Sequence, residues 1–167
     1  MNANVINVLR RVEIFKNLGD TELGAIAELC KVGRVKKGQA IFHEDAEGVE
    51  LYVVHDGAVE IQVKTRGSDG KPRQSTINTL YEGQSFGEMA LLGSGARSAS
   101  AIAAATPTTL LVMDGNELAR LCDANPLIGS RVYRNLLDDL AYKLRSASLL
   151  LRGHIKWQDG QLSTLGQ

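Results

Sequence analysis

The residues best suited to binding chemistry lie in the glycine-rich stretch from Gly83 to Ser100. Here a carboxylate, Glu88, directly follows Gly87, and an arginine, Arg97, comes after a short apolar run and a second glycine-containing loop. The fork of an arginine can donate two parallel hydrogen bonds to a phosphate. A helical turn that begins near Glu88 would also point its free N–H groups toward an anion. We therefore expect one site that holds an anion at Arg97 and hydroxyl groups at Glu88.

Each of these residues also has a plainer interpretation, which the residues alone leave open. Arg97 is compatible with a surface arginine paired with an acid, and Glu88 with the cap of a helical turn. The neighbouring residues favour binding, because Gly87 permits close approach of a ligand to the backbone. The small side chains of Ser98 and Ala99 also leave space for a bulky ligand.

The sequence offers no pattern for catalysis or for metal binding. The histidines His43, His55 and His154 stand in separate contexts, without a nucleophile or second base at a useful spacing. The two cysteines, Cys30 and Cys122, lie far apart and outside any CxxC motif, so metal-ligand spacing is absent. We expect a protein that is not an enzyme, with no catalytic residues, no metal and no cofactor.

The composition is typical of a soluble globular protein, since 44% of the 167 residues are hydrophobic and 23% are charged. The 19 basic and 19 acidic residues balance, so no overall positive charge attracts nucleic acid. No apolar run reaches the roughly 18 residues of a membrane helix, and the N-terminus lacks a signal-peptide core. We expect a cytoplasmic protein with no membrane contact.

The elements that must position Glu88 and Arg97 fall into three zones. Apolar residues recur at helical spacing up to about Val32, and again from Asn116 onward. Between these zones, from Gly33 to Met113, short β-prone runs are separated by glycines. This arrangement predicts an α+β fold around a small antiparallel sandwich or barrel.

Two hairpins are predicted in the central zone. Apolar and polar side chains alternate from Ala58 to Val63, as in a half-buried antiparallel strand. The dipeptide Asp56-Gly57 before it tolerates positive φ, so it predicts a hairpin with the preceding run, Leu51–His55. The polar segment Arg66–Arg73 predicts the tip of a second hairpin.

The C-terminal zone predicts one long helix with a heptad seam. Its apolar positions are Tyr133, Leu137, Leu140, Leu144, Ala147 and Leu151. Such a seam either packs on the barrel of its own chain or binds a partner helix. Because the helix is long and carries further apolar surface, we expect a homodimer through the 127–151 helix.

The order Phe86-Gly-Glu-Met-Ala-Leu-Leu92, a short spacer and Arg97-Ser-Ala-Ser100 resembles the phosphate-binding cassette of the cyclic nucleotide-binding domain family. Further segments match that family in the same order, among them Phe15–Leu18, Lys37–Phe42 and Tyr52–Ile61. The resemblance covers about residue 8 to about residue 150. It implies an antiparallel β-roll or jelly-roll barrel, flanked by N-terminal helices and a long C-terminal helix.

The resemblance also implies roles for single residues. Arg97 would bind the exocyclic oxygens of a cyclic phosphate, and Glu88 would accept a hydrogen bond from the ribose 2′-hydroxyl, with Gly87 letting the sugar sit close. Ile77 would face the base, and the C-terminal helix near Leu140–Leu144 would close over it. The remaining residues assigned to the ligand site are Phe86, Met89, Ala90, Ser98 and Ala99, with backbone N–H groups near Met89, Ala90 and Ser98 completing the phosphate cradle.

The function that the resemblance implies is a sensor, which binds a cyclic nucleotide unaltered and signals by rearranging its C-terminal helix. In eukaryotic members a hydroxyl residue directly after the arginine favours guanine, whereas a bacterial member with serine there responds to cAMP. Ser98 therefore leaves cAMP slightly favoured over cGMP. Some members have lost nucleotide binding, so the alternative is a nucleotide-free scaffold for dimerisation or protein docking. The chain keeps both Arg97 and Glu88, which favours binding.

The expected organisation is one domain over residues 1–152, followed by a short polar tail, residues 153–167. This tail is too short for the helix-turn-helix domain that bacterial activators of the family carry. We therefore expect a free-standing sensor that does not bind DNA directly and acts through an unidentified protein partner.

Overall fold

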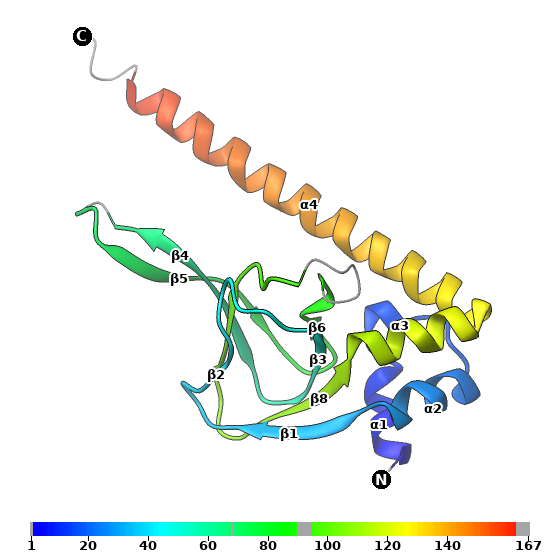
Figure 1. Cartoon of the computed structure of the whole chain (residues 1–167). Coiled ribbons are helices and arrows are strands. Elements are labelled where there is room, and N and C mark those ends of the chain that lie inside the picture. The colour runs from blue at the N-terminus through cyan, green and yellow to red at the C-terminus, as the bar shows by residue number, and fades with distance from the viewer. Residues whose placement is uncertain (1, 68, 90–94, 163–167) are drawn as a thin grey trace.

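The N-terminal segment forms two helices joined by a 3₁₀ helix. In this computed structural model the backbone is described for residues 2–67, 69–89 and 95–162, and side chains from residue 4 to 149 within those ranges except 146 and 147. Helix α1 spans Asn2–Leu9, the 3₁₀ helix η1 spans Glu13–Phe15, and helix α2 spans Asp20–Glu28. These elements lie together at one end of the molecule (Figure 1).

Two four-stranded antiparallel sheets form the centre of the fold (Figure 1). The first sheet has the order β1 (Lys31–Val35), β8 (Thr108–Asp114), β3 (Glu50–Asp56), β6 (Ser85–Phe86). The second has the order β2 (Ala40–Phe42), β7 (Ser100–Ala103), β4 (Val59–Arg66), β5 (Pro72–Leu80). The predicted α+β class and the antiparallel β-roll flanked by helices are confirmed. The short strands β6 and β7, which enclose the predicted cassette, were not predicted.

The predicted hairpin at Asp56-Gly57 is wrong, because the chain crosses there from one sheet to the other. β3 pairs with β8 and β6, whereas β4 pairs with β5 and β7. Gly57 does have a positive φ of 89°, and a Cβ there would lie 2.9 Å from the Pro107 carbonyl oxygen. The turn signal identified the backbone conformation but not the pairing partner. The second predicted hairpin is confirmed, since β4 and β5 pair from Val59↔Leu80 to Arg66↔Pro72.

Buried apolar side chains form two clusters. The first joins the N-terminal helices, the first sheet and the start of the C-terminal helix, with members that include Phe15, Ile26, Leu51, Met113 and Val132. The second lies in the β-roll and consists of Val54, Val59, Leu80, Phe86, Ala101 and Leu110. Full burial of one such large side chain is worth roughly 1.5–3 kcal/mol. The first cluster therefore anchors the start of the C-terminal helix to the N-terminal helices.

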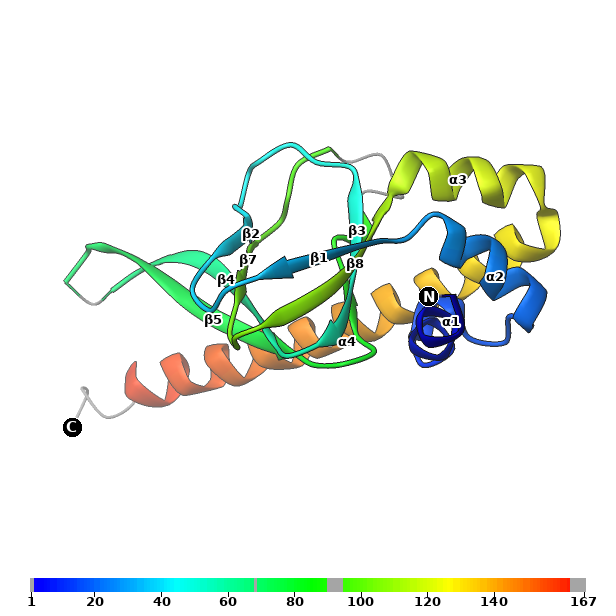
Figure 2. The same cartoon turned by 90° about the horizontal axis from the view of Figure 1, so that it is seen from below.

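Helix α3 (Gly115–Ala124) leads into helix α4 (Pro126–Leu162), which runs alongside the β-roll and ends far from the N-terminal helices (Figure 1, Figure 2). Helix α4 continues through the expected boundary between residues 152 and 153, so no helix end marks that boundary. Within the described parts of the chain, no helix is both long and apolar enough to cross a membrane.

The predicted heptad seam of α4 does not face in one direction. Ile128, Val132 and Leu136 are buried in the chain's own core at a spacing of four residues, as expected for a helix packed on a globular core. By contrast, Leu137 is 64% exposed and Leu144 is 69% exposed. Two members of the seam, Tyr133 and Leu140, are partly buried against the core, and the side chains of Ala147 and Leu151 lie outside the described residues.

Candidate functional site

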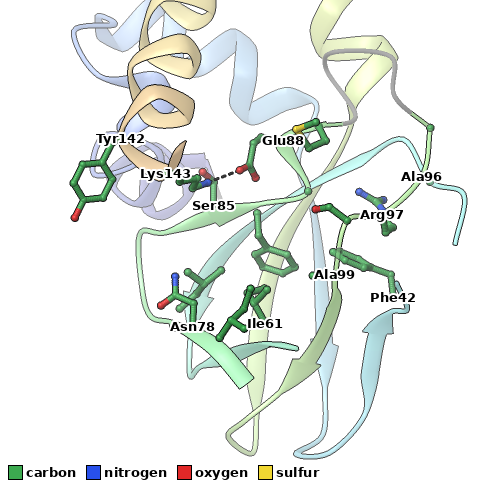
Figure 3. A pocket seen from close by; sticks show the side chains of 18 residues that line it. Phe42, Ile61, Asn78, Ser85, Glu88, Ala96, Arg97, Ala99, Tyr142 and Lys143 are labelled. Carbon is green, nitrogen blue, oxygen red and sulfur yellow. Dashed lines mark hydrogen bonds and ion pairs between the residues drawn. The ribbon is translucent and has the colours of Figure 1, made fainter. Parts of the chain in front are cut away.

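A cavity of about 520 Å³ lies between the β-roll and helix α4 (Figure 3). Its volume is within the usual range for a small-molecule site. Its lining includes every predicted site residue that the structure describes, namely Ile77, Phe86, Gly87, Glu88, Met89, Arg97, Ser98 and Ala99. Ala90 lies outside the described residues. The fold thus brings the two ends of the cassette and a residue of β5 to one hollow.

Arg97 is held in place by contacts within the chain. Its side chain is only 5% exposed, and both terminal nitrogens donate to Glu50: Nη1 to the main-chain oxygen and Nη2 to Oε2, each at 2.8 Å. The guanidinium also lies 4.4 Å from the centre of the Phe42 ring. Arg97 is therefore paired with an acid, as one interpretation of the sequence allowed, but it is buried rather than on the surface.

The remaining nitrogen of this guanidinium, Nε of Arg97, is buried and has no hydrogen-bond acceptor among the described residues. A buried donor without an acceptor costs free energy comparable to a lost hydrogen bond. Arg97 lines the cavity, but Nε itself has almost no exposed surface, so an anion would accept this bond only after a small movement of the side chain. The geometry fits the predicted phosphate-binding role.

Two glycines make room for the guanidinium. A Cβ on Gly48 would lie 2.5 Å from Nη2 of Arg97, and a Cβ on Gly87 would lie 2.9 Å from Nη1. Gly87 also has a φ of 78° and would place its Cβ 2.8 Å from the Glu50 main-chain oxygen. The sequence assigned Gly87 to the approach of a sugar. In the structure, its lack of a side chain accommodates Arg97 and Glu50.

Glu88 begins a 3₁₀ turn together with Met89, one residue after the end of β6, and it is 8% exposed. Its Oε1 atom forms an ion pair with Nζ of Lys143 on α4 (Figure 3). Lys143 also pairs with Asp139, one turn earlier on α4, at 2.7 Å. Burial by itself lowers the pKa of Lys143, but the carboxylates of Glu88 and Asp139 outweigh it and raise the pKa above the ordinary lysine value. The lysine is therefore cationic at neutral pH.

The rest of the lining is apolar on one side and mixed at the mouth. Phe42, Ile61 and Leu80 line the wall, and the Phe86 ring is stacked on Tyr52 with centroids 5.1 Å apart. The residues at the mouth are more exposed: Ile77 is 61% exposed and Tyr142, on α4, is 67% exposed; Asn78 of β5 lies beside Ile77. This increase in exposure from the apolar wall to the mouth suits a ligand with a planar, partly apolar end near the mouth.

Sequence analysis missed Glu50, Lys143 and Asn78. Glu50 opens a strand whose apolar run was recognised, but nothing local shows that its carboxylate reaches Arg97. The C-terminal helix was expected to meet the ligand near Leu140–Leu144, and Tyr142 and Lys143 do lie in this range. No group of three or more His, Cys, Asp and Glu side chains that could hold a metal occurs in the described part of the chain.

The β-roll, the cassette and the C-terminal helix together define a small-molecule-binding regulatory module. Residues 32–125 match the cyclic nucleotide-binding domain, and the chain belongs to the family of that domain. It is 36% identical over 138 residues to the cyclic AMP receptor protein of Thermus thermophilus, covering 83% of this chain and 60% of that protein. It is 35% identical over 108 residues to human cGMP-dependent protein kinase 2, covering 65% of this chain and 14% of that kinase.

Solved structures give the same assignment. The catabolite activator protein of Thermus thermophilus superposes with a TM-score of 0.69 and 32% identity, covering 83% of this chain and 61% of that chain. A structure described as cAMP bound PfPKA-R (141-441) superposes with a TM-score of 0.58 and 29% identity, covering 69% and 39% of the two chains. The chain therefore spans a small part of the cGMP-dependent kinase and somewhat under two thirds of the cyclic AMP receptor protein.

Proposed function

We propose that the cavity binds a cyclic nucleoside monophosphate, with cAMP preferred over cGMP, and that α4 reports its occupancy. The observation that carries the proposal is that two buried side chains of opposite charge, Arg97 and Glu88, line the same cavity. Arg97 has a buried Nε–H without an acceptor among the described residues, and Glu88 lines the cavity at the start of a 3₁₀ turn. A buried cation and a buried acceptor in one hollow suit a ligand that carries an anion and hydroxyl groups.

The orientation of the ligand follows from this pair of charges. The cyclic phosphate would lie at Arg97, next to the backbone of Ser98, and the ribose would lie at Glu88. The base would extend toward the mouth, between Ile77 and the exposed ring of Tyr142 on α4. Aromatic and apolar side chains suit a purine because they stack on it without selecting its edge.

The preference for cAMP rests on the relatives, because Ser98 does not discriminate between the two nucleotides. The cyclic AMP receptor protein aligns over 83% of this chain, whereas the cGMP-dependent kinase aligns over 65%. Ser98 lines the cavity and its residue type suits either nucleotide, so the longer alignment favours cAMP.

The proposed readout is a shift in the packing of α4, with no chemistry done on the ligand. Helix α4 supplies Tyr142 and Lys143 to the cavity, and the same helix exposes Leu137 and Leu144. A homodimer through the 127–151 helix would bury these leucines and give the shift a partner to act on. A further protein partner would then recognise the altered dimer.

One observation favours the alternative, a nucleotide-free scaffold. The Glu88 carboxylate, which the ligand would need, is already paired with Lys143. A scaffold would keep this pair permanently and use the β-roll only for dimerisation or docking.

Calorimetric titration with cAMP and with cGMP separates the two functions. Binding by the wild type should weaken by about 30-fold or more in Arg97→Ala, because losing a charge-assisted contact in a buried site costs about 2–5 kcal/mol. Arg97→Lys, which keeps the charge but not the fork, should bind with intermediate affinity, and circular dichroism confirms that each variant folds. Absence of heat and of a thermal shift with both nucleotides supports the scaffold.

A further inference from the structure

The side chain of Lys143 connects helix α4 to Glu88 in the lining of the cavity. It is the residue through which α4 reaches Glu88, and Figure 3 shows this ion pair bridging from the helix to the end of β6. The Glu88 side chain is 10% exposed and that of Lys143 is 44% exposed. Ion pairs with one partner so well buried are more than loose surface contacts, because removing either partner leaves a desolvated charge.

The position of the pair conflicts with the proposed ligand. A ribose hydroxyl needs the Glu88 carboxylate as an acceptor, and Oε1 of that carboxylate is occupied by an ammonium group. A charge-assisted bond is stronger than the bond a neutral hydroxyl would form in its place. Nucleotide binding at Glu88 therefore has to displace Lys143 or share the carboxylate with it.

Asp139 makes that displacement feasible. It pairs with the same ammonium at 2.7 Å and stands four residues before Lys143 on the same helix. If the ammonium leaves Glu88, the Asp139 pair moves with α4 and still compensates the charge. The lysine thus has one partner on the β-roll, which a ligand can take over, and one on its own helix, which it keeps.

We propose that Lys143 is an autoinhibitory latch: its ion pair with Glu88 holds α4 over the cavity, and a nucleotide displaces the lysine from Glu88 when it binds. The proposal rests on the proposed function, because it requires a cyclic nucleotide whose ribose competes for Glu88. Only molecules in the released state bind nucleotide at full affinity, so the apparent affinity is the intrinsic affinity multiplied by the fraction of released molecules. It also couples ligand entry to movement of the helix that exposes Leu137 and Leu144.

The test compares the cAMP affinity of the wild type with that of Lys143→Met, which keeps most of the length of the side chain and removes its charge. We expect Lys143→Met to bind cAMP about fivefold more tightly or better, the lower end of typical coupling between linked equilibria. Lys143→Arg, which keeps the charge, should remain close to the wild type. Lys64→Met is the matched control, because Lys64 also forms an ion pair, with Asp45 at 2.6 Å, but does not line the cavity.

A second readout needs no nucleotide. In ligand-free protein, backbone hydrogen exchange across residues 138–146 should be faster in Lys143→Met than in the wild type, and unchanged in Lys64→Met. Equal or weaker cAMP binding by Lys143→Met, with binding by the wild type intact, overturns the latch alone. Unchanged exchange in this segment also overturns it. Failure of both the wild type and Lys143→Met to bind either nucleotide overturns the proposed function, and the latch with it.

Discussion

Arg97 and Glu50 form a two-point contact, in which one terminal guanidinium nitrogen binds the main-chain oxygen of Glu50 and the other binds its carboxylate, each at 2.8 Å. Glu50 opens β3 and is paired in register with Asp114 of β8. The arginine is therefore fixed to the frame of the first sheet by contacts within the chain. A preorganised arginine loses less freedom when it binds a phosphate.

The first prediction concerns this contact. Glu50→Gln should weaken cAMP binding, because Arg97 loses the charge that fixes its fork. It should also lower the free energy of unfolding by about 1–2 kcal/mol, less than for a fully buried pair because Glu50 is half-exposed. Urea denaturation gives the stability and calorimetry the affinity. Glu82→Gln breaks an exposed pair with Arg11 and should change neither quantity appreciably. Equal effects of the two substitutions would contradict the positioning role of Glu50.

The second prediction uses the space around the guanidinium. Gly48→Ala should weaken nucleotide binding with only a modest loss of stability, since the new Cβ would lie 2.5 Å from Nη2 of Arg97 and push the fork aside. Gly87→Ala should lower both the nucleotide affinity and the stability. Its φ of 78° is strained for alanine, and the new Cβ would lie 2.8 Å from the Glu50 main-chain oxygen. Gly24→Ala on α2 meets nothing within 4 Å, and should leave binding unchanged and add about 0.5–1 kcal/mol of stability. Thermal melts and cAMP titrations of the three variants check this order.

The third prediction concerns the thiols. Burial raises the pKa of Cys30 to about 12, and burial together with the nearby Asp123 raises the pKa of Cys122 to about 11. Both groups are therefore neutral thiols at pH 8, and Ellman's reagent should label them far more slowly in the folded protein than in urea. Because the folded pKa values lie above the ordinary value of 9.0, the unfolded chain releases protons first. The stability that the two thiols contribute should be constant below about pH 8 and should be lost as the pH rises from about 9 to 12. Rapid labelling of either thiol in native buffer at pH 8 would contradict the prediction.

The fourth prediction tests the proposed homodimer. A double substitution, Leu137→Glu with Leu144→Glu, should convert a dimer into a monomer in sedimentation velocity. The glutamates would replace exposed apolar contacts by like charges that repel each other across the interface. Leu127→Glu alters another exposed leucine, in the first turn of α4 and outside the predicted seam, and should leave the dimer intact. A monomeric wild type at high concentration would remove the helix as a dimer contact.

The predicted secondary structure was most accurate where one local pattern decides the conformation. The β4–β5 hairpin follows from the alternation of residues 58–63 and from the polar tip, and both signals lie within the hairpin itself. The turn at Gly57 has the positive φ that its dipeptide predicted, but its strands belong to different sheets. Strand pairing depends on segments distant in sequence, so a turn residue cannot specify it.

The same division applies to α4. A period near 3.6 predicts a helix, and the helix is present. The direction of each apolar side chain depends on what the β-roll and the N-terminal helices leave open to it. Within the predicted seam, Tyr133 and Leu140 are partly buried against the core, whereas Leu137 is 64% exposed. The seam was therefore predicted as one face, although the packing divides it.

By itself the sequence determined the α+β class, the family, and the cassette residues that line the cavity, because these are encoded in contiguous patterns of residue type and spacing. Only the tertiary structure decided which distant side chains complete the site. Glu50 reaches Arg97 across 47 residues and Lys143 reaches Glu88 across 55 residues. Such contacts arise when buried surfaces pack and bring remote charges into the same desolvated space. A charge there must find a partner, and which partner is near is a property of the fold.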